Sequence, residues 1–178
     1  DYLKSLDIAD EAYFAPEYEF YLFSKVAFSS ESNYSFYHID TEEGYWNNDS
    51  DGDNVEYIPM PKQQGYHRSF PADRMFQVRH DITKEMDKFG IKYRYHHHEV
   101  GGPSQHEIEV PLMPLFKACE STTWVKYIAK NTARYYGLFA TFMPKPLSKD
   151  AGSGMHNHMT LFKNGKNKTF RSPSTART

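Results

Sequence analysis

The chain of 178 residues has little cysteine, little net charge and no long apolar run. Its single cysteine, Cys119, excludes an internal disulfide and a cysteine-based zinc cage, so a reducing compartment is compatible with it. The formal net charge of -2 offers no electrostatic attraction for nucleic acid or for a membrane surface. No apolar run reaches membrane-spanning length, and no signal peptide or internal repeat is recognisable. These absences argue against nucleic-acid-binding, membrane-spanning and disulfide-stapled proteins.

Aromatic residues, in contrast, are plentiful. They make up 16% of the sequence, with 14 Tyr and 13 Phe, and β-strands favour such residues. Aromatic-rich runs at residues 13–28 and 34–40 predict strands, after a helical lead-in over residues 1–12. The polar run 47–53 predicts a solvated surface loop, because it has no bidentate glutamate in register for a calcium loop.

Apolar periodicity predicts two long helices, over residues 71–89 and 114–136, each followed by a glycine that favours a helix end. Cys119 falls within the second helical pattern, which predicts a small core residue. The residues predicted to face inward are Met75, Val78, Ile82, Met86 and Phe89 in the first helix, and Leu115, Ala118, Thr122, Val125, Ile128, Ala129 and Thr132 in the second.

A stretch rich in ligand-type side chains lies in the middle of the chain. It reads His-His-His-Glu-Val-Gly-Gly-Pro-Ser-Gln-His-Glu-Ile-Glu over residues 96–109, and Gly-Gly-Pro predicts a turn between two strands. A turn centred on the proline places Glu99 opposite Glu107. The same register places His97 opposite Glu109. Because like charges facing each other destabilise a sheet, such a hairpin either holds a cation or exposes its acidic face to solvent.

Two further strands carry paired ligand-type side chains. Glu17 and Glu19 lie two residues apart in an aromatic-rich run, so strand periodicity places both carboxylates on one face, opposite Tyr18 and Phe20. The imidazoles at positions 156 and 158 share a face for the same reason. One such pair on a strand is more often structural, but three pairs of carboxylates or imidazoles together indicate a metal site.

At these residues the chain resembles the bacterial and archaeal type I glutamine synthetases. The motifs PEYEF, HHHEVGGPSQHEIE and GSGMHNH, in this order, are similar to the three metal-binding strands of that family, and ATFMPKP at residues 140–146 strengthens the match. The resemblance runs from Tyr13 to about Leu161. It implies an α+β fold with a curved antiparallel β-sheet (a half-barrel) of about five or six strands, metals on its concave face and helices on the outer face.

The resemblance also implies that residues 1–178 form an internal part of the glutamine synthetase catalytic domain. The N-terminal β-grasp domain and the C-terminal third would then lie outside the chain. The family ligates ammonia to L-glutamate with ATP, through a γ-glutamyl phosphate. It is cytoplasmic and assembles as a homododecamer of two hexameric rings. The chain alone is predicted to be inactive, because half of the active site would be missing.

The resemblance assigns metal ligands residue by residue. Glu19, Glu99 and Glu107 should hold one divalent ion, nearer the glutamate. Glu17 and His156 should hold the second ion, nearer the ATP phosphates, with a third ligand from outside the chain. An oxygen-rich donor set with few nitrogens suits Mg²⁺ or Mn²⁺ better than zinc. Divalent metal is therefore expected to stabilise the fold.

Substrate contacts are also implied. His158 and Thr160 take positions near ATP, and the backbone of Gly152 takes a position near glutamate. The resemblance gives no ligand role to the remaining polar residues of the central hairpin, which are interpreted as neighbours of the ligands or surface residues: His96, His97, His98, His106 and Glu109.

Three positions depart from the family and leave alternatives open. Ala151 stands where an asparagine often contacts the amino-acid substrate, Arg94 where a glutamate approaches the nucleotide, and Leu112 where an aromatic packs on adenine. One alternative is therefore a related ligase that joins glutamate to a larger amine such as a polyamine. Another is a catalytically silent, structural or regulatory member. A cupin-like oxygenase is disfavoured, because residues 163–168 offer no glutamate after the His-x-His pair.

Overall fold

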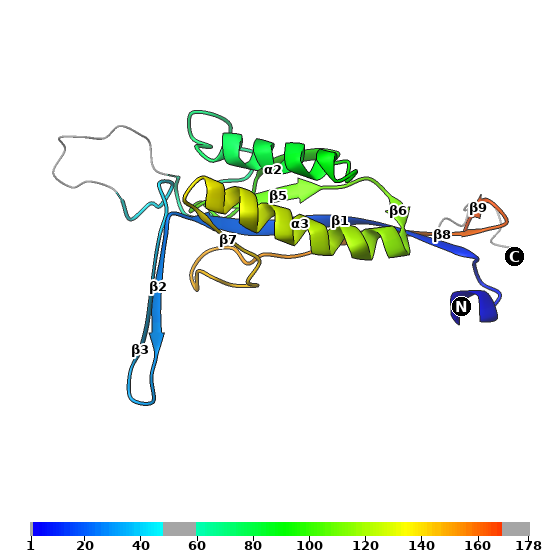
Figure 1. Cartoon of the computed structure of the whole chain (residues 1–178), viewed down its shortest axis with the longest axis horizontal. Coiled ribbons are helices and arrows are strands. Elements are labelled where there is room, and N and C mark those ends of the chain that lie inside the picture. Colours follow the sequence, from blue (N-terminus) through cyan, green and yellow to red (C-terminus); the bar gives the residue numbers. More distant parts are fainter. Residues whose placement is uncertain (1, 48–59, 169–178) are drawn as a thin grey trace, which may run out of the picture.

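A computed structural model of the chain describes residues 2–47 and 60–168. Most of the predicted loop at residues 47–53 lies outside these residues. The helices and strands (Figure 1) are α1 Tyr2–Ser5, β1 Glu11–Phe23, β2 Lys25–Ser30, β3 Ser35–Asp40, α2 Phe76–Lys88, β4 Tyr95–His98, β5 Gln105–Glu109, β6 Met113–Pro114, α3 Leu115–Tyr135, β7 Phe139–Thr141, β8 Asn157–Lys163 and β9 Lys166–Asn167.

The long strand β1 organises a seven-stranded antiparallel sheet. β5 and β6 pair with one edge of β1, while β8 and β7 pair with the other. β4 lies outside β5, and β9 lies outside β8. The sheet has more strands than predicted because β6 and β9 contain only two residues each, too few for a periodic pattern.

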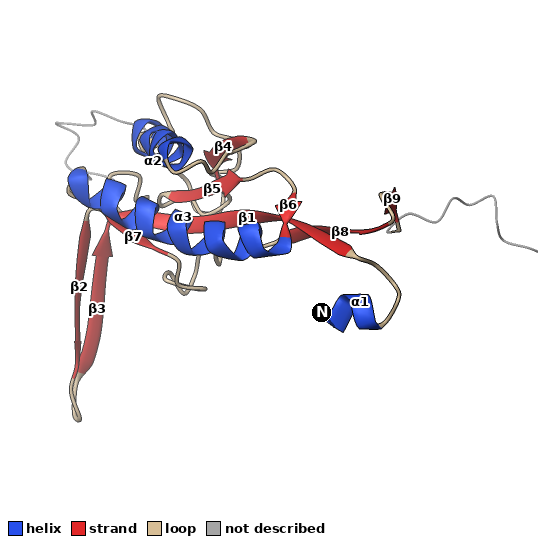
Figure 2. Ribbon diagram, turned by 45° about the vertical axis from the view of Figure 1, so that its right-hand side comes forward, coloured by secondary structure: helices blue, strands red, loops and turns tan. Residues whose placement is uncertain are grey.

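Helices α2 and α3 cover one face of this sheet (Figure 2). Tyr18, Phe20 and Leu22 point from β1 into the core between sheet and helices, where each is at most 1% exposed. The predicted α+β fold with helices outside a curled antiparallel half-barrel is therefore confirmed. The carboxylates of Glu17 and Glu19 point to the opposite face, as the period of two predicts.

The predicted strand at residues 13–28 is in fact two strands. The chain turns at Ser24, and β2 pairs with β3 in a separate two-stranded sheet that projects from the rest of the molecule (Figures 1 and 2). Its aromatic side chains are largely exposed; Phe28 is 75% exposed. Aromatic content alone therefore predicted a strand but not which sheet it joins.

Helix α2 begins at Phe76, five residues later than predicted. The carboxylate of Glu43 accepts hydrogen bonds from the backbone N–H groups of Arg74 and Met75, at 2.7 and 3.3 Å, so a distant residue satisfies this helix end. Both long helices stop at the predicted glycines, Gly90 and Gly137, which have positive φ values of 73° and 74°.

Most of the predicted core stripe is buried, but three predictions were wrong. Phe89 is 49% exposed, Leu115 is 40% exposed, and Cys119 is exposed. Phe89 and Leu115 lie at the ends of their helices, and Phe89 packs against the partly exposed Trp124 ring, with centroids 5.1 Å apart. Among the described residues, no helix is long and apolar enough to cross a membrane.

Candidate metal centre

Glutamates from β1 and β5 face each other across the sheet. Glu19 pairs with Glu107, and Glu17 pairs with Glu109. Sequence reasoning expected like charges to oppose each other within the central hairpin instead. There the register differs by two residues, with His97 opposite Glu107 and the turn centred on Gly102. A shift of two keeps every side chain on its predicted face, so the acidic face forms nevertheless.

Three carboxylates predicted to share a metal ion lie together. One ligand oxygen from each of Glu19, Glu99 and Glu107 lies within 4.8 Å of the other two. Gln105 Nε2 and the backbone N–H of Gly154 donate to Glu19 Oε2, at 3.2 and 2.9 Å, and hold that carboxylate in place. The cluster joins β1, β5 and the turn after β4, so only the assembled sheet creates it.

The turn that carries Glu99 is clamped by the segment around Gly65. The N–H of Gly65 donates to the carbonyl of Val100 at 3.1 Å, and the N–H of His67 donates to that of His98 at 3.0 Å. A Cβ at position 65 would lie 2.4 Å from both the Glu99 carbonyl and the His98 ring, so only glycine permits this approach.

Glu107 is the least compensated of these carboxylates. It is 5% exposed, and within the described part of the chain no group donates a hydrogen bond to it. Burial, followed by the negative charges of Glu99, Glu17 and Glu19, raises the pKa of Glu107 to about 8. Burial also raises the pKa of Glu99. A buried carboxylate among others is the environment that a divalent cation would neutralise.

Glu17 lies beside both predicted imidazoles. His156 Nδ1 is 3.3 Å from Glu17 Oε2 and 3.9 Å from Glu19 Oε1, while His158 Nε2 is 2.6 Å from Glu17 Oε1. Both imidazoles are more than two-thirds exposed, which leaves them accessible to ligands. The structure thus brings Glu17 and His156 together, with His158 adjacent.

Residues predicted to contact substrates lie around this acidic face. Thr160 and Leu112 line one cavity of about 330 Å³, together with Glu11, Tyr13 and Phe162. The carbonyl oxygen of Gly152 accepts a hydrogen bond from Gln105 Nε2 at 2.8 Å. Gln105 therefore links the Gly152 loop to Glu19, a role that the sequence did not reveal.

The opposite face of β4 and β5 carries a buried polar network that sequence reasoning missed. Arg79 is 1% exposed and donates to both carboxylate oxygens of Asp73, to His96 and to His106, at 2.6 to 3.1 Å. Burial and the Arg79 charge lower the pKa of His96 to about 4 and hold the pKa of His106 well below its usual range. The spacing of Asp73 and Arg79, six residues apart, gave no periodic signal.

His98 and Glu43 form a second buried pair on this face. His98 Nδ1 lies 2.7 Å from the Glu99 carbonyl, and Nε2 lies 3.2 Å from Glu43 Oε2. Because the carbonyl can only accept, we assign the Nδ1 proton from this contact. Burial lowers the pKa of His98, but the hydrogen bond and charge of Glu43 outweigh it and raise the pKa overall. His98, interpreted as a neighbour of the ligands, therefore supports the Glu99 backbone from behind.

The chain is similar to glutamine synthetases along nearly its whole length. Residues 1–177 match the family model described as glutamine synthetase, catalytic domain. The chain is 40% identical to the glutamine synthetase of Aquifex aeolicus over 166 residues, which cover 93% of this chain and 35% of the relative. It is 45% identical to that of Streptomyces filamentosus over 164 residues, covering 92% and 35%. The chain thus spans about a third of the length of the curated relatives that it matches.

Solved structures agree. The cryo-EM structure of Plasmodium falciparum glutamine synthetase superposes with a TM-score of 0.85 at 30% identity, covering 98% of this chain and 34% of that chain. A structure described as a GmaS/ADP complex superposes with a TM-score of 0.63 at 21% identity, covering 92% and 32%, and shows a shared fold alone.

Proposed function

The chain belongs to the glutamine synthetase catalytic-domain family, and from that premise we propose that it supplies the metal-binding part of a glutamate–ammonia ligase. The proposed reaction joins ammonia to L-glutamate with ATP, through a γ-glutamyl phosphate. The observation that carries the proposal is the convergence of Glu19, Glu99 and Glu107, because three converging carboxylates, one of them without a hydrogen-bond donor among the described residues, suit a divalent cation.

We propose Mg²⁺ or Mn²⁺ as the cofactor, with two ions per site. Glu19, Glu99 and Glu107 would hold one ion, while Glu17 and His156 would hold the other with a ligand from outside this chain. The donors fit such ions, because oxygen predominates and the one nitrogen comes from an exposed imidazole. When bound, the ions supply charge neutralisation for the phosphoryl group during its transfer.

The protein's own residues would then position substrates. Gln105 holds the Gly152 carbonyl and Glu19 together, which supports a glutamate-binding role for the Gly152 loop. The cavity with Thr160 lies on the same sheet as His158, which supports placing ATP there. Leu112, which also lines this cavity, would give the nucleotide an aliphatic rather than an aromatic contact.

A larger amine is the second candidate acceptor. Ala151 has no polar side chain to offer an amino-acid substrate, and its carbonyl is already bonded by the Tyr21 hydroxyl at 2.6 Å. A silent member of the family is a third candidate. The set of metal-type residues argues against it, because a silent protein gains nothing from mutually repelling carboxylates.

Phosphate release from ATP tests these candidates. A full-length protein carrying this sequence would be assayed with Mg²⁺ and glutamate, offering ammonium in one series and a panel of amines in another. Stimulation by ammonium supports the glutamate–ammonia ligase. Stimulation by an amine alone moves the protein to the second candidate, and no glutamate-dependent release with either acceptor would contradict both.

The chain alone is expected to release no phosphate, because it spans only about a third of its relatives' length. The homododecameric assembly of two rings and the cytoplasmic location remain predictions that rest on family membership. Size-exclusion chromatography with light scattering of the full-length protein would check the former.

A further inference from the structure

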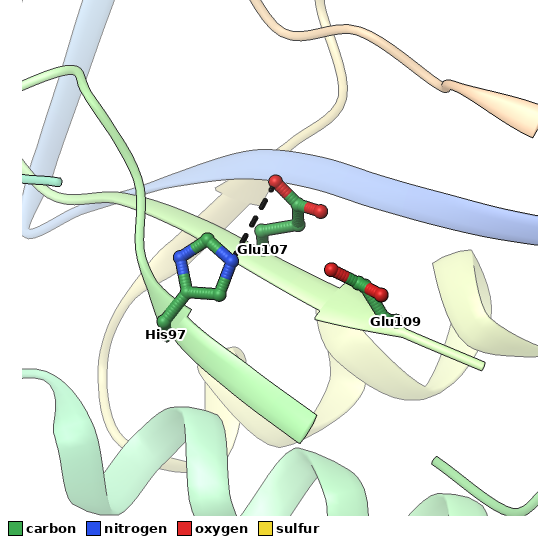
Figure 3. A group of neighbouring side chains, drawn as sticks. All are labelled: His97, Glu107 and Glu109. Carbon is green, nitrogen blue, oxygen red and sulfur yellow. Dashed lines mark ion pairs between the residues drawn. The ribbon is translucent and has the colours of Figure 1, made fainter. Parts of the chain in front are cut away.

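A second ligand-type cluster lies next to the proposed metal residues. His97 from β4 and the pair Glu107 and Glu109 from β5 point to the same face (Figure 3). One ligand atom from each lies within 4.8 Å of the other two. Glu107 also belongs to the Glu19 cluster, whereas His97 and Glu109 have no part in the proposed function.

The His97 imidazole is oriented as a metal ligand would be. Its Nδ1 lies 2.9 Å from the His98 carbonyl oxygen, which can only accept, so Nδ1 carries the proton and Nε2 of the neutral ring has a free lone pair. Metal-binding histidines commonly donate their other N–H to a carbonyl in this way. Nε2 points toward Glu107, with 3.8 Å between Nε2 and Oε2 (Figure 3).

The His97 ring is also buried and fixed. Its side chain is 9% exposed, and within the described residues Nε2 makes no hydrogen bond. The His67 ring stacks on it with centroids 4.3 Å apart and planes 16° apart, and the Tyr95 ring stacks with centroids 6.0 Å apart. A nitrogen lone pair on a mostly buried ring, within 4.8 Å of two carboxylates, indicates a ligand between them.

Glu109 has only partial compensation from the protein. Its side chain is 8% exposed and lies opposite Glu17 on β1. Arg94 Nη1 is 3.6 Å away, beyond hydrogen-bond distance, on a side chain that is 53% exposed. The Tyr95 hydroxyl is the other neighbour, and its hydrogen bond to Glu109 raises the pKa of Tyr95 to about 12. Both groups belong to side chains that are largely exposed, so neither is a buried partner for Glu109.

We propose that His97, Glu107 and Glu109 bind an additional divalent ion of the transition-metal class, such as Mn²⁺, which shares Glu107 with the Glu19 cluster. One imidazole and two carboxylates suit Mn²⁺, Co²⁺ or Zn²⁺, whereas Mg²⁺ prefers oxygen ligands. Sharing is compatible with paired-ion sites, in which ions lie roughly 3.5 to 4 Å apart. The proposal stands on His97 and Glu109 and does not require the proposed reaction.

Nitrogen coupling to bound Mn²⁺ tests the proposal. The 178-residue chain would carry His156→Ala and His158→Ala, which remove the two imidazoles beside Glu17 and alter only exposed side chains. Millimolar Mg²⁺ would compete for oxygen-only sites. Pulsed electron paramagnetic resonance is expected to show nitrogen coupled to Mn²⁺ in this background. Adding His97→Ala should abolish the coupling.

A carboxylate pair supplies the matched control. Glu109→Gln should weaken the nitrogen-coupled Mn²⁺ by at least about tenfold, whereas Glu19→Gln should leave the coupling in place. Glu109→Gln preserves side-chain volume, so it remains informative if His97→Ala fails to fold. Absence of nitrogen coupling in the His156/His158 background, or its persistence after His97→Ala, would overturn the proposal.

Discussion

The two faces of β4 and β5 both bury charged side chains, but they differ in whether those charges have hydrogen-bond partners within the protein. On the helix-facing side, Arg79 donates two hydrogen bonds to Asp73 and one each to His96 and His106. On the other side, buried carboxylates face one another, and Glu107 has no hydrogen-bond donor among the described residues. The charges of the first face are paired within the protein, whereas those of the second would be neutralised by the proposed cations.

This difference distinguishes a structural cluster from a binding site. Buried charges are tolerated when every donor and acceptor is satisfied, and they are strongly unfavourable when they are not. The network of Asp73 and Arg79 therefore contributes to the stability of the fold. The acidic face is retained at the expense of stability, which is typical of residues that bind a ligand.

The largest loss of stability is expected from a substitution in the buried network of Asp73 and Arg79. Asp73→Ala leaves the Arg79 guanidinium buried without its carboxylate and should destabilise the protein by about 3 to 5 kcal/mol. Asp87→Ala, which breaks an exposed ion pair with Lys92, should change stability by less than about 1 kcal/mol. Urea unfolding of both variants measures this contrast, and equal losses would contradict it.

A smaller loss of stability is expected when Glu43 is substituted. Glu43→Gln keeps the side-chain size but weakens the N-terminal bonds of α2 and the pair with His98, and should remove about 1 to 3 kcal/mol. Glu42→Gln is the matched control, because its carboxylate is 55% exposed and its ion pair within the described part of the chain is with Arg74 at the surface. Thermal unfolding compares the two variants. A Glu43→Gln protein as stable as the control would show that the cap contributes little.

The acidic face should respond in the opposite direction. Without metal near pH 7, Glu107→Gln removes a carboxyl group that must take up a proton on folding, because it is buried opposite Glu19, and should raise stability by up to about 1 kcal/mol. With millimolar Mn²⁺, wild type should instead be more stable than Glu107→Gln, because bound Mn²⁺ stabilises wild type and the variant has lost a metal-binding carboxylate. Melting temperatures of wild type and variant, measured in EDTA and in Mn²⁺, give the stability difference without and with metal. Glu11→Gln, an exposed carboxylate of β1, should show neither change.

The smallest expected effect is the dependence of stability on pH. Because the folded-state pKa of Glu107 is about 8, above its ordinary value of 4.5, the folded protein holds a proton that the unfolded chain releases. The corresponding stability is present below about pH 4.5 and is lost as pH rises toward 8. In EDTA, wild type should therefore lose stability across this window more steeply than Glu107→Gln. Mn²⁺ affinity should rise over the same window, since the ion competes with the proton.

The metal-type residues could be predicted from the sequence because strand periodicity is local. Residues two apart on a strand lie on one face, so the pairing of Glu17 with Glu19 and of His156 with His158 followed directly from their spacing. The hairpin register was wrong by two residues because it depends on turn geometry, which Gly-Gly-Pro does not specify alone. The error was harmless for the site, since an even shift preserves the face.

Other features depend on contacts between distant segments and left no local signal. The start of α2 is set by Glu43, more than thirty residues earlier, so the helical pattern from Pro71 onward overestimated its length. His97 shares the face of Glu99 by spacing, and this was the one available sign of a ligand role. Its orientation depends on the His98 carbonyl and the stacked His67 ring.

Backbone periodicity and donor chemistry are local properties, so the sequence predicted most of the strands, the faces of their side chains and the metal-type residues. Which carboxylates converge and which charges are compensated depends on the tertiary structure. Convergence depends on strand order and burial depends on what packs above, and neither is encoded at short range. The acidic face and the Arg79 network carry similar residues, and only their partners distinguish them.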